Sequence, residues 1–152
     1  MNKQEVYDFL QKRNIWFEVT EHPAVYNMAE LADIPMPYPE ADTKNLFVRD
    51  DKKRNYYLIT VKGDKRADLK ALRTAQQTRP LSFASSDDLL RLLELTPGSV
   101  TPLGLLNDAK NAVTLFLNQD FSGGLIGVHP NDNTATVWLH TEDLIALLKA
   151  NG

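Results

Sequence analysis

The order of helical and strand patterns along this 152-residue chain is the feature that most constrains its fold. Short runs typical of strands alternate with amphipathic helical patterns, and several runs are joined by connections of hairpin length. No regular strand–helix–strand repeat is present. This order favours an α+β domain with a mixed, mainly antiparallel sheet over a doubly wound parallel sheet. The length fits one domain, which we expect to span residues 1–152.

Helical patterns occur at both ends of the chain and in its middle. The first predicted helix begins with a capping pair, Asn2 and Glu5, and an apolar stripe follows this pair. The other predicted helices cover 27–32, 67–77, a segment opened by Ser85 and Asp88 that continues through Leu93, and a C-terminal segment from a Thr141 N-cap through Leu148.

Runs rich in β-forming residues predict the strands, at 16–20, 45–49, 56–61, 81–84, 113–117, 125–128 and 134–139. The second and third runs flank a polar turn over 50–55, which predicts a hairpin with Lys44 at its entrance. Before this hairpin, three prolines at alternate positions in Ile34–Pro39 require an extended loop that can form a wall or a lid.

The composition excludes several classes of protein. The chain has no cysteine, so it has no disulfide, iron–sulfur cluster, thiolate zinc site or cysteine nucleophile. It contains no Walker A loop, G-x-S-x-G elbow or H-E-x-x-H motif, and three histidines alone make a poor zinc site. We therefore expect no metal and no cofactor. No apolar run approaches about 18 residues and the N-terminus lacks a signal-like stretch, which favours a cytoplasmic protein.

The charge is unevenly distributed. Residues 44–79 contain 11 Lys and Arg against 4 Asp and Glu, a net charge of +7, whereas the whole chain carries −3, so the remainder carries −10. A basic middle between acidic ends indicates either an anion-binding face, with nucleic acid as one candidate ligand, or a solvated basic surface.

Three sites stand out as candidates for chemistry, each with a structural alternative. Lys44 follows the proline-rich loop and precedes an apolar strand, where an ammonium group can hold a phosphate or polarise a carbonyl; alternatively, it is a solvated charge. The loop Gly98–Pro102 can present backbone groups to an ester or ribose, or it is an ordinary turn. His129 ends a strand, where it can donate to a ligand or serve as a structural hydrogen-bonding group.

Five segments, taken in order, resemble the YbaK-like prolyl-tRNA editing family. They are Glu21-His-Pro-Ala-Val25, Thr43-Lys-Asn-Leu-Phe47, Tyr57-Leu-Ile-Thr60, the loop-containing segment Leu95–Gly104, and Val128-His-Pro-Asn131 with Asn133-Thr-Ala-Thr136. Within the family, the second and fourth segments look most like the free-standing alanyl-tRNA(Pro) deacylases, relatives of the editing domain inserted in bacterial prolyl-tRNA synthetase. The resemblance covers nearly the whole chain.

The resemblance implies a curved mixed sheet around a small pocket and hydrolysis of the ester that joins a wrong amino acid to tRNA(Pro). Lys44 occupies the position of the family's essential lysine, and His129 would line the substrate pocket. The loop residues Gly98, Ser99, Val100, Thr101 and Pro102 would contact the aminoacyl-adenosine end. The sequence departs from the family at Asn27, where threonine or serine is expected. The implied partners are mischarged tRNA(Pro) and, as a further candidate, prolyl-tRNA synthetase.

For a protein of this family, the basic segment 44–79 has a predicted role, because its cations can contact phosphates of the tRNA acceptor stem. The predicted tRNA-binding residues are Lys52, Lys53, Arg54, Lys65, Arg66, Lys70 and Arg73.

Two alternative functions stay open. The chain can be a deacylase for cysteine- or serine-mischarged tRNA, or a non-catalytic module that binds aminoacyl-tRNA or a synthetase.

Overall fold

The computed structural model describes residues 2–22, 37–38, 41–52, 54–62, 69–96, 99–108, 112–118, 121–132 and 134–151. Its elements are α1 (Lys3–Lys12), β1 (Phe17–Glu21), β2 (Thr43–Asp50), β3 (Tyr56–Lys62), α3 (Leu69–Gln76), β4 (Leu81–Phe83), α4 (Ser86–Leu93), the 3-10 helix η3 (Pro102–Asn107), β5 (Val113–Leu117), β6 (Leu125–Val128), β7 (Ala135–His140) and α5 (Thr141–Asn151). The predicted helix over 27–32 and nearly all of the proline-rich loop lie outside the described residues.

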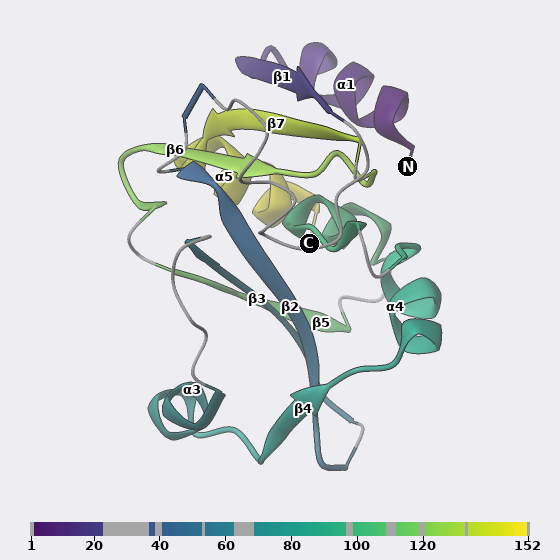
Figure 1. The fold of residues 1–152 in the computed structure, drawn as a ribbon, viewed down its shortest axis with the longest axis vertical. Coiled ribbons are helices and arrows are strands. Elements are labelled where there is room, and N and C mark those ends of the chain that lie inside the picture. The colour runs from purple at the N-terminus through teal and green to yellow at the C-terminus, as the bar shows by residue number, and fades with distance from the viewer. Residues whose placement is uncertain are drawn as a thin grey trace.

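The strands form two sheets that meet at one point (Figure 1). A three-stranded antiparallel sheet has the order β1-β7-β6, and a four-stranded sheet has the order β4-β2-β3-β5, in which only the β3–β5 pair is parallel. The predicted mixed, mainly antiparallel α+β fold is confirmed. The two sheets are joined by a bridge between Asp42, just before β2, and Gly127 in β6.

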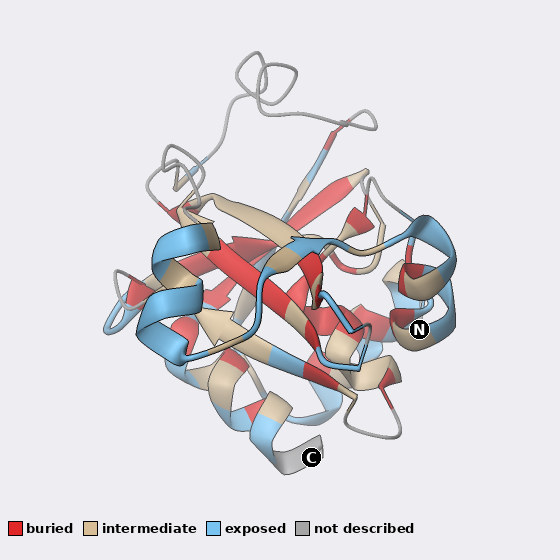
Figure 2. Cartoon of the chain, turned by 90° about the horizontal axis from the view of Figure 1, so that it is seen from below, coloured by how far each residue is buried: buried red, intermediate tan, exposed pale blue. Residues whose placement is uncertain are grey.

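Each sheet has its own apolar core. Residues of α1, η3 and α5 pack on the three-stranded sheet, in a cluster of Val6, Leu10, Leu103, Phe121, Ile126, Val128, Val137, Leu139, Leu144 and Leu147. Residues of α4 pack on the four-stranded sheet, in a cluster of Phe47, Tyr56, Leu58, Leu89, Leu93, Leu95 and Val113. Figure 2 shows the buried residues along the strands and the exposed ones on the outer turns of the helices.

The helix starts follow their predicted caps in two of three cases. Asn2 and Glu5 form a capping box at α1, and the Ser85 hydroxyl accepts a hydrogen bond from the backbone N–H of Asp88 at α4. The predicted Thr141 cap is wrong, because within the described residues its buried hydroxyl has no hydrogen-bond partner. The Glu142 carboxylate instead accepts a hydrogen bond from the backbone N–H of Gly123, which ties α5 to the preceding turn.

Two local differences from the sequence predictions bear on the site. β2 begins at Thr43 rather than Asn45, so Lys44 lies within the strand and not at its entrance. The chain after Thr101 forms the 3-10 helix η3, which the sequence patterns did not predict, and the Thr101 hydroxyl accepts a hydrogen bond from the backbone N–H of Leu103 at its start.

Candidate active site

The first residues of β2 are fixed against β6. The Thr43 hydroxyl donates a hydrogen bond of 2.7 Å to the backbone carbonyl of Gly127, next to the bridge at Asp42. Gly127 has no room for a side chain, because an added Cβ would overlap the Trp138 ring on β7. Only glycine therefore fits at this position beside the start of β2.

Hydrogen bonds also orient Asn45, the third residue of β2. Its side-chain amide donates to the Thr43 hydroxyl at 3.1 Å, and its amide oxygen accepts from the Thr60 hydroxyl of β3 at 2.6 Å. Thr43 and Asn45 lie on the same face of the sheet, because side chains alternate along a strand. The same alternation directs the half-buried Lys44 to the opposite face.

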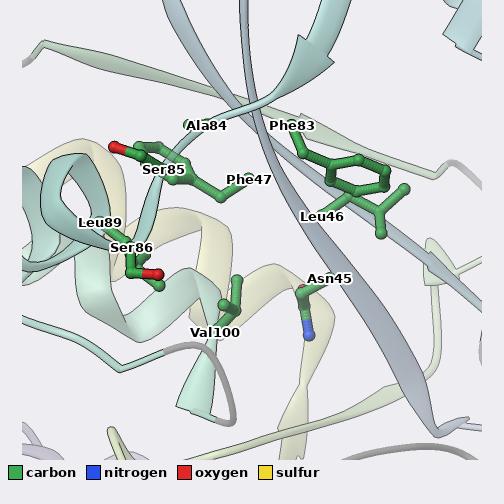
Figure 3. Close-up of a pocket in the computed structure, with 9 residues that line it drawn as sticks. All are labelled: Asn45, Leu46, Phe47, Phe83, Ala84, Ser85, Ser86, Leu89 and Val100. Carbon is green, nitrogen blue, oxygen red and sulfur yellow. The ribbon is translucent and has the colours of Figure 1, made fainter.

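A cavity of about 250 Å³ lies beside β2 on the side of α4 (Figure 3). We call it the edge cavity. Its polar lining residues are Asn45, Ser85 and Ser86, and its apolar lining residues are Leu46, Phe47, Phe83, Ala84, Leu89 and Val100. Asn45 and Val100 lie near each other at one end of the cavity in Figure 3, so β2 and the predicted loop contribute to the same wall.

Of the predicted loop residues, only Val100 is placed to contact a ligand in the edge cavity. Ser99, Thr101 and Pro102 are buried, and Gly98 lies outside the described residues. The backbone N–H of Ser99 donates to the Thr96 carbonyl, which turns the chain after α4. The loop therefore contributes one apolar side chain to the cavity, and its hydroxyl groups face inward.

His129 lies in a second group of polar residues, on the three-stranded sheet. Its Nδ1 is 2.9 Å from the Ala135 carbonyl, and since a carbonyl only accepts, Nδ1 carries the proton. Burial lowers the pKa of His129 below its usual 6.5, so the ring is neutral at pH 7. Its ring lies edge-on to that of His22, with 6.2 Å between the ring centroids.

His22 and Asp42 complete this group. His22 Nε2 lies 3.0 Å from the Thr136 hydroxyl of β7. Burial raises the pKa of Asp42 to about 6, and the nearby His22 partly opposes this rise. We call His22, Asp42, His129 and Thr136 the histidine cluster. In the described parts of the chain, no three histidine, aspartate or glutamate side chains are arranged to hold a metal ion.

Lys44 lies between the two groups along β2. It follows Asp42 of the histidine cluster by two residues and precedes Asn45 of the edge cavity by one, so its Cα is within about 7 Å of both. Lys44 itself is not among the described residues that line the edge cavity. The described residues thus bring the strand of Lys44 next to Val100. The Lys44 side chain leaves β2 on the face opposite to Asn45, which is the face that Leu46 of the cavity lining also uses.

Residues 22–147 match the aminoacyl-tRNA editing domain family. The chain belongs to this family. It is 41% identical to the prolyl-tRNA editing protein ProX of Acetoanaerobium sticklandii over 151 residues, which cover 99% of this chain and 92% of that protein. It is 34% identical to the prolyl-tRNA synthetase associated domain-containing protein 1 of Mus musculus, over 89% of this chain and 82% of that protein.

The fold also resembles a solved structure. The crystal structure of a candidate trans-editing enzyme for prolyl-tRNA synthetase superposes with a TM-score of 0.69 at 23% identity, covering 97% of this chain and 91% of that chain. Membership in the editing family confirms the resemblance carried by segments such as Thr43–Phe47. It also makes the chain an aminoacyl-tRNA deacylase, a hydrolase of the ester bond.

The predicted tRNA-binding cations of this editing domain gather at one end. Lys52 and Arg54 are exposed at the β2–β3 turn, and Lys70 and Arg73 are exposed on α3. Figure 1 shows the turn and α3 together at the end of the molecule away from the β1-β7-β6 sheet. The remaining three predicted cations, Lys53, Lys65 and Arg66, lie outside the described residues.

A salt bridge joins these two basic elements. Arg79, which follows α3, donates two hydrogen bonds to the Asp51 carboxylate in the β2–β3 turn, at 2.6 and 3.0 Å. The pair links the turn to the segment between α3 and β4, and both side chains are exposed. It also compensates the charge of Arg79, so this residue contributes less to the basic face than the sequence count indicates.

The sequence patterns missed several residues of the two groups. Asp42 and Thr136 showed no signal of their own, because a single carboxylate or hydroxyl beside a strand is common. Phe83 carried a usable signal, because it is an aromatic residue on the short predicted strand 81–84. Asn45 stood inside the family motif without an assigned role.

In the described residues, no helix is long and apolar enough to cross a membrane.

Proposed function

We propose that this chain is a free-standing editing enzyme that hydrolyses alanyl-tRNA(Pro) in the cytoplasm and leaves prolyl-tRNA(Pro) intact. The similarity to ProX over nearly the full length of both proteins supports the editing of prolyl-tRNA. The structural observation that carries the proposal is the position of Lys44 in β2, between Asp42 of the histidine cluster and Asn45 of the edge cavity.

The specificity problem explains why such an enzyme is needed. A synthetase site built for proline also admits the smaller alanine, and a missing methylene changes binding by only about 1–3 kcal/mol. A second site that is too small for the pyrrolidine ring then removes the error. In this proposal the editing site admits the alanine methyl group and excludes proline by overlap with its walls, since inserting extra methylenes into a packed site is costly.

Hydrolysis needs a positioned ester and a group that stabilises negative charge. Water attacks the ester carbonyl carbon, the bond to the ribose oxygen breaks, this oxygen takes a proton, and alanine leaves as the free acid. The Lys44 ammonium group stabilises the oxyanion that develops on the carbonyl oxygen, as preorganised cations do. Val100 and the adjoining loop position the aminoacyl-adenosine end.

His129 contributes through its second ring nitrogen. Because Nδ1 donates to the Ala135 carbonyl, the neutral ring has a lone pair on Nε2. This lone pair can accept a hydrogen bond from the α-ammonium group of alanine and so orient the ester toward Lys44. The basic residues Lys52, Arg54, Lys70 and Arg73 bind phosphates of the acceptor stem, and prolyl-tRNA synthetase is the enzyme whose errors are corrected.

A panel of charged tRNAs tests the proposal. The protein is incubated with alanyl-, seryl-, cysteinyl- and prolyl-tRNA(Pro), and release of the free amino acid is measured. We expect fast release of alanine and none of proline. Preferential release of serine or cysteine would replace the proposed substrate, and protection of every ester without release would make the chain a binding module.

A further inference from the structure

The edge of β2 that faces the edge cavity is open over a short stretch. On this side, Asp42 bridges to Gly127, and residues 48–50 pair with β4. The backbone N–H of Ala84 extends this contact by donating to the Phe47 carbonyl at 3.0 Å. Among the described residues, no strand pairs with residues 43–46 on this side.

The backbone of Asn45 faces this opening. In an antiparallel strand the N–H and C=O of one residue point to the same side, and the side alternates from residue to residue. The Phe47 carbonyl points toward β4, whereas the Asp50 N–H points toward β3 and donates to the Asn55 carbonyl. Asn45, two residues before Phe47, therefore directs its backbone donor and acceptor toward the edge cavity.

An exposed aromatic ring stands beside the opening. Phe83, the last residue of β4, is 65% exposed, the highest value among the large apolar side chains that the structure describes as exposed. It lines the edge cavity, and Figure 3 shows its ring next to the Leu46 side chain. The exposed ring offers a ligand a flat apolar face directly beside the polar groups of an open strand edge.

We propose that the edge cavity is a nucleobase subsite, in which an unpaired base of the tRNA 3′ end stacks on Phe83 and pairs its edge with the Asn45 backbone. This inference rests on the proposed function. A flat ring with adjacent donors and acceptors fits both features, because single-stranded RNA is bound by stacking on aromatic side chains and by hydrogen bonds to base edges.

Size and charge agree with this ligand. The cavity volume of about 250 Å³ lies below the roughly 300–1,000 Å³ of sites for drug-sized ligands and suits one planar heterocycle. Segment 44–79, which supplies the β2 part of the lining, carries a net charge of +7, and this charge favours a phosphodiester chain. A peptide strand fits less well, because the open stretch is too short for strand addition and is closed at both ends by β6 and β4.

Binding of an uncharged RNA hairpin with an unpaired 3′ end tests the subsite. The dissociation constant is measured for the intact hairpin and for hairpins that lack one unpaired base at a time. Phe83→Ala should weaken binding of the intact hairpin about tenfold. For the hairpin that lacks the stacked base, the same substitution should change binding less than twofold.

Matched variants separate stacking from damage to the fold. Phe83→Tyr keeps a stacking ring and should bind the intact hairpin within twofold of the wild type. Leu90→Ala removes another exposed apolar side chain, 59% exposed and outside the cavity lining, and should leave binding unchanged. An equal loss on all hairpins with Phe83→Ala, or no loss on any, would overturn the subsite.

Deacylation distinguishes this inference from the proposed function. Phe83→Ala should raise the KM for alanyl-tRNA(Pro) about tenfold and leave kcat within twofold. If the wild type releases alanine but Phe83→Ala changes neither KM nor hairpin binding, the subsite is wrong and the proposed function stands. If the wild type releases no amino acid while the base-dependent loss persists in the hairpin assay, the subsite stands and the proposed function is wrong.

Discussion

Two aromatic residues, one on each sheet of this editing domain, are placed in opposite ways: Trp138 is buried and Phe83 is exposed. On the β1-β7-β6 sheet, Trp138 is fully buried, its indole N–H donates to the Thr20 hydroxyl at 2.9 Å, and Tyr38 packs edge-on against it. On the β4-β2-β3-β5 sheet, Phe83 stands largely in water beside a cavity. The contrast teaches that the first sheet packs tightly beside the histidine cluster, whereas the second leaves an aromatic ring exposed beside the edge cavity.

Gly127→Ala gives the largest expected change in this comparison. The added Cβ overlaps the Trp138 ring, which is buried and hydrogen-bonded and so has nowhere to move. We expect a loss of about 3 kcal/mol in the free energy of unfolding, measured by denaturant titration. Gly124→Ala is the control, because its Cβ meets only the Phe121 carbonyl, at 3.9 Å. Equal stability of the two variants would contradict the tight packing of the first sheet.

Asp42→Asn tests the burial of the histidine cluster through pH. The folded protein holds the proton of Asp42 up to a pKa of about 6, above the usual value of 3.8, so folding loses stability as the pH rises from about 4 to about 6. Asparagine carries no charge, so the stability of the Asp42→Asn variant does not fall in this pH range. After allowance for screening by solvent, we expect Asp42→Asn to raise the free energy of unfolding by about 1 kcal/mol at pH 7.5 and to leave it unchanged at pH 4. Thermal unfolding at both pH values measures it, and a gain that is equal at both would contradict the assigned burial.

Lys70→Ala should have the smallest effect. It tests the proposed basic face, to which Lys70 on α3 contributes one cation. Removing one phosphate contact should reduce the slope of log binding constant against log salt by about one, with a modest loss of affinity for tRNA. Lys149→Ala, an exposed lysine on α5 outside the basic segment, is the matched control. The proposed basic face would be wrong if both variants gave the same slope as the wild type.

Local patterns predicted most elements because their causes are local. The Asn2–Glu5 capping box and the Ser85 cap depend on residues close in sequence, and each lies where it was expected. The Thr141 cap failed because α5 begins at Thr141 itself, where the hydroxyl is buried against the core and accepts no hydrogen bond among the described residues. The division into two sheets was likewise not predictable, since it depends on which strands pair across long stretches of sequence, as in the bridge between Asp42 and Gly127.

The candidate site was predictable only where a motif marked it. The Thr43–Phe47 motif singled out Lys44, but the alternation that puts Lys44 and Asn45 on opposite faces appears only when the bounds of the strand are known. The same holds for Asp42, because its raised pKa arises from burial between segments. Gly98–Pro102 was expected to present its polar groups to a ligand, yet burial of Ser99 and Thr101 leaves Val100 as the described contact.

Release of alanine from alanyl-tRNA(Pro) by the wild type and by Lys44→Ala is the most direct test of the account. Lys62→Ala is the control, because Lys62 is a half-buried lysine on the neighbouring strand β3, paired with Thr43. We expect Lys44→Ala to lower kcat at least about 100-fold with an unchanged melting temperature, and Lys62→Ala to stay near the wild-type rate. A folded Lys44→Ala protein that releases alanine at the wild-type rate would contradict the central role of this ammonium group.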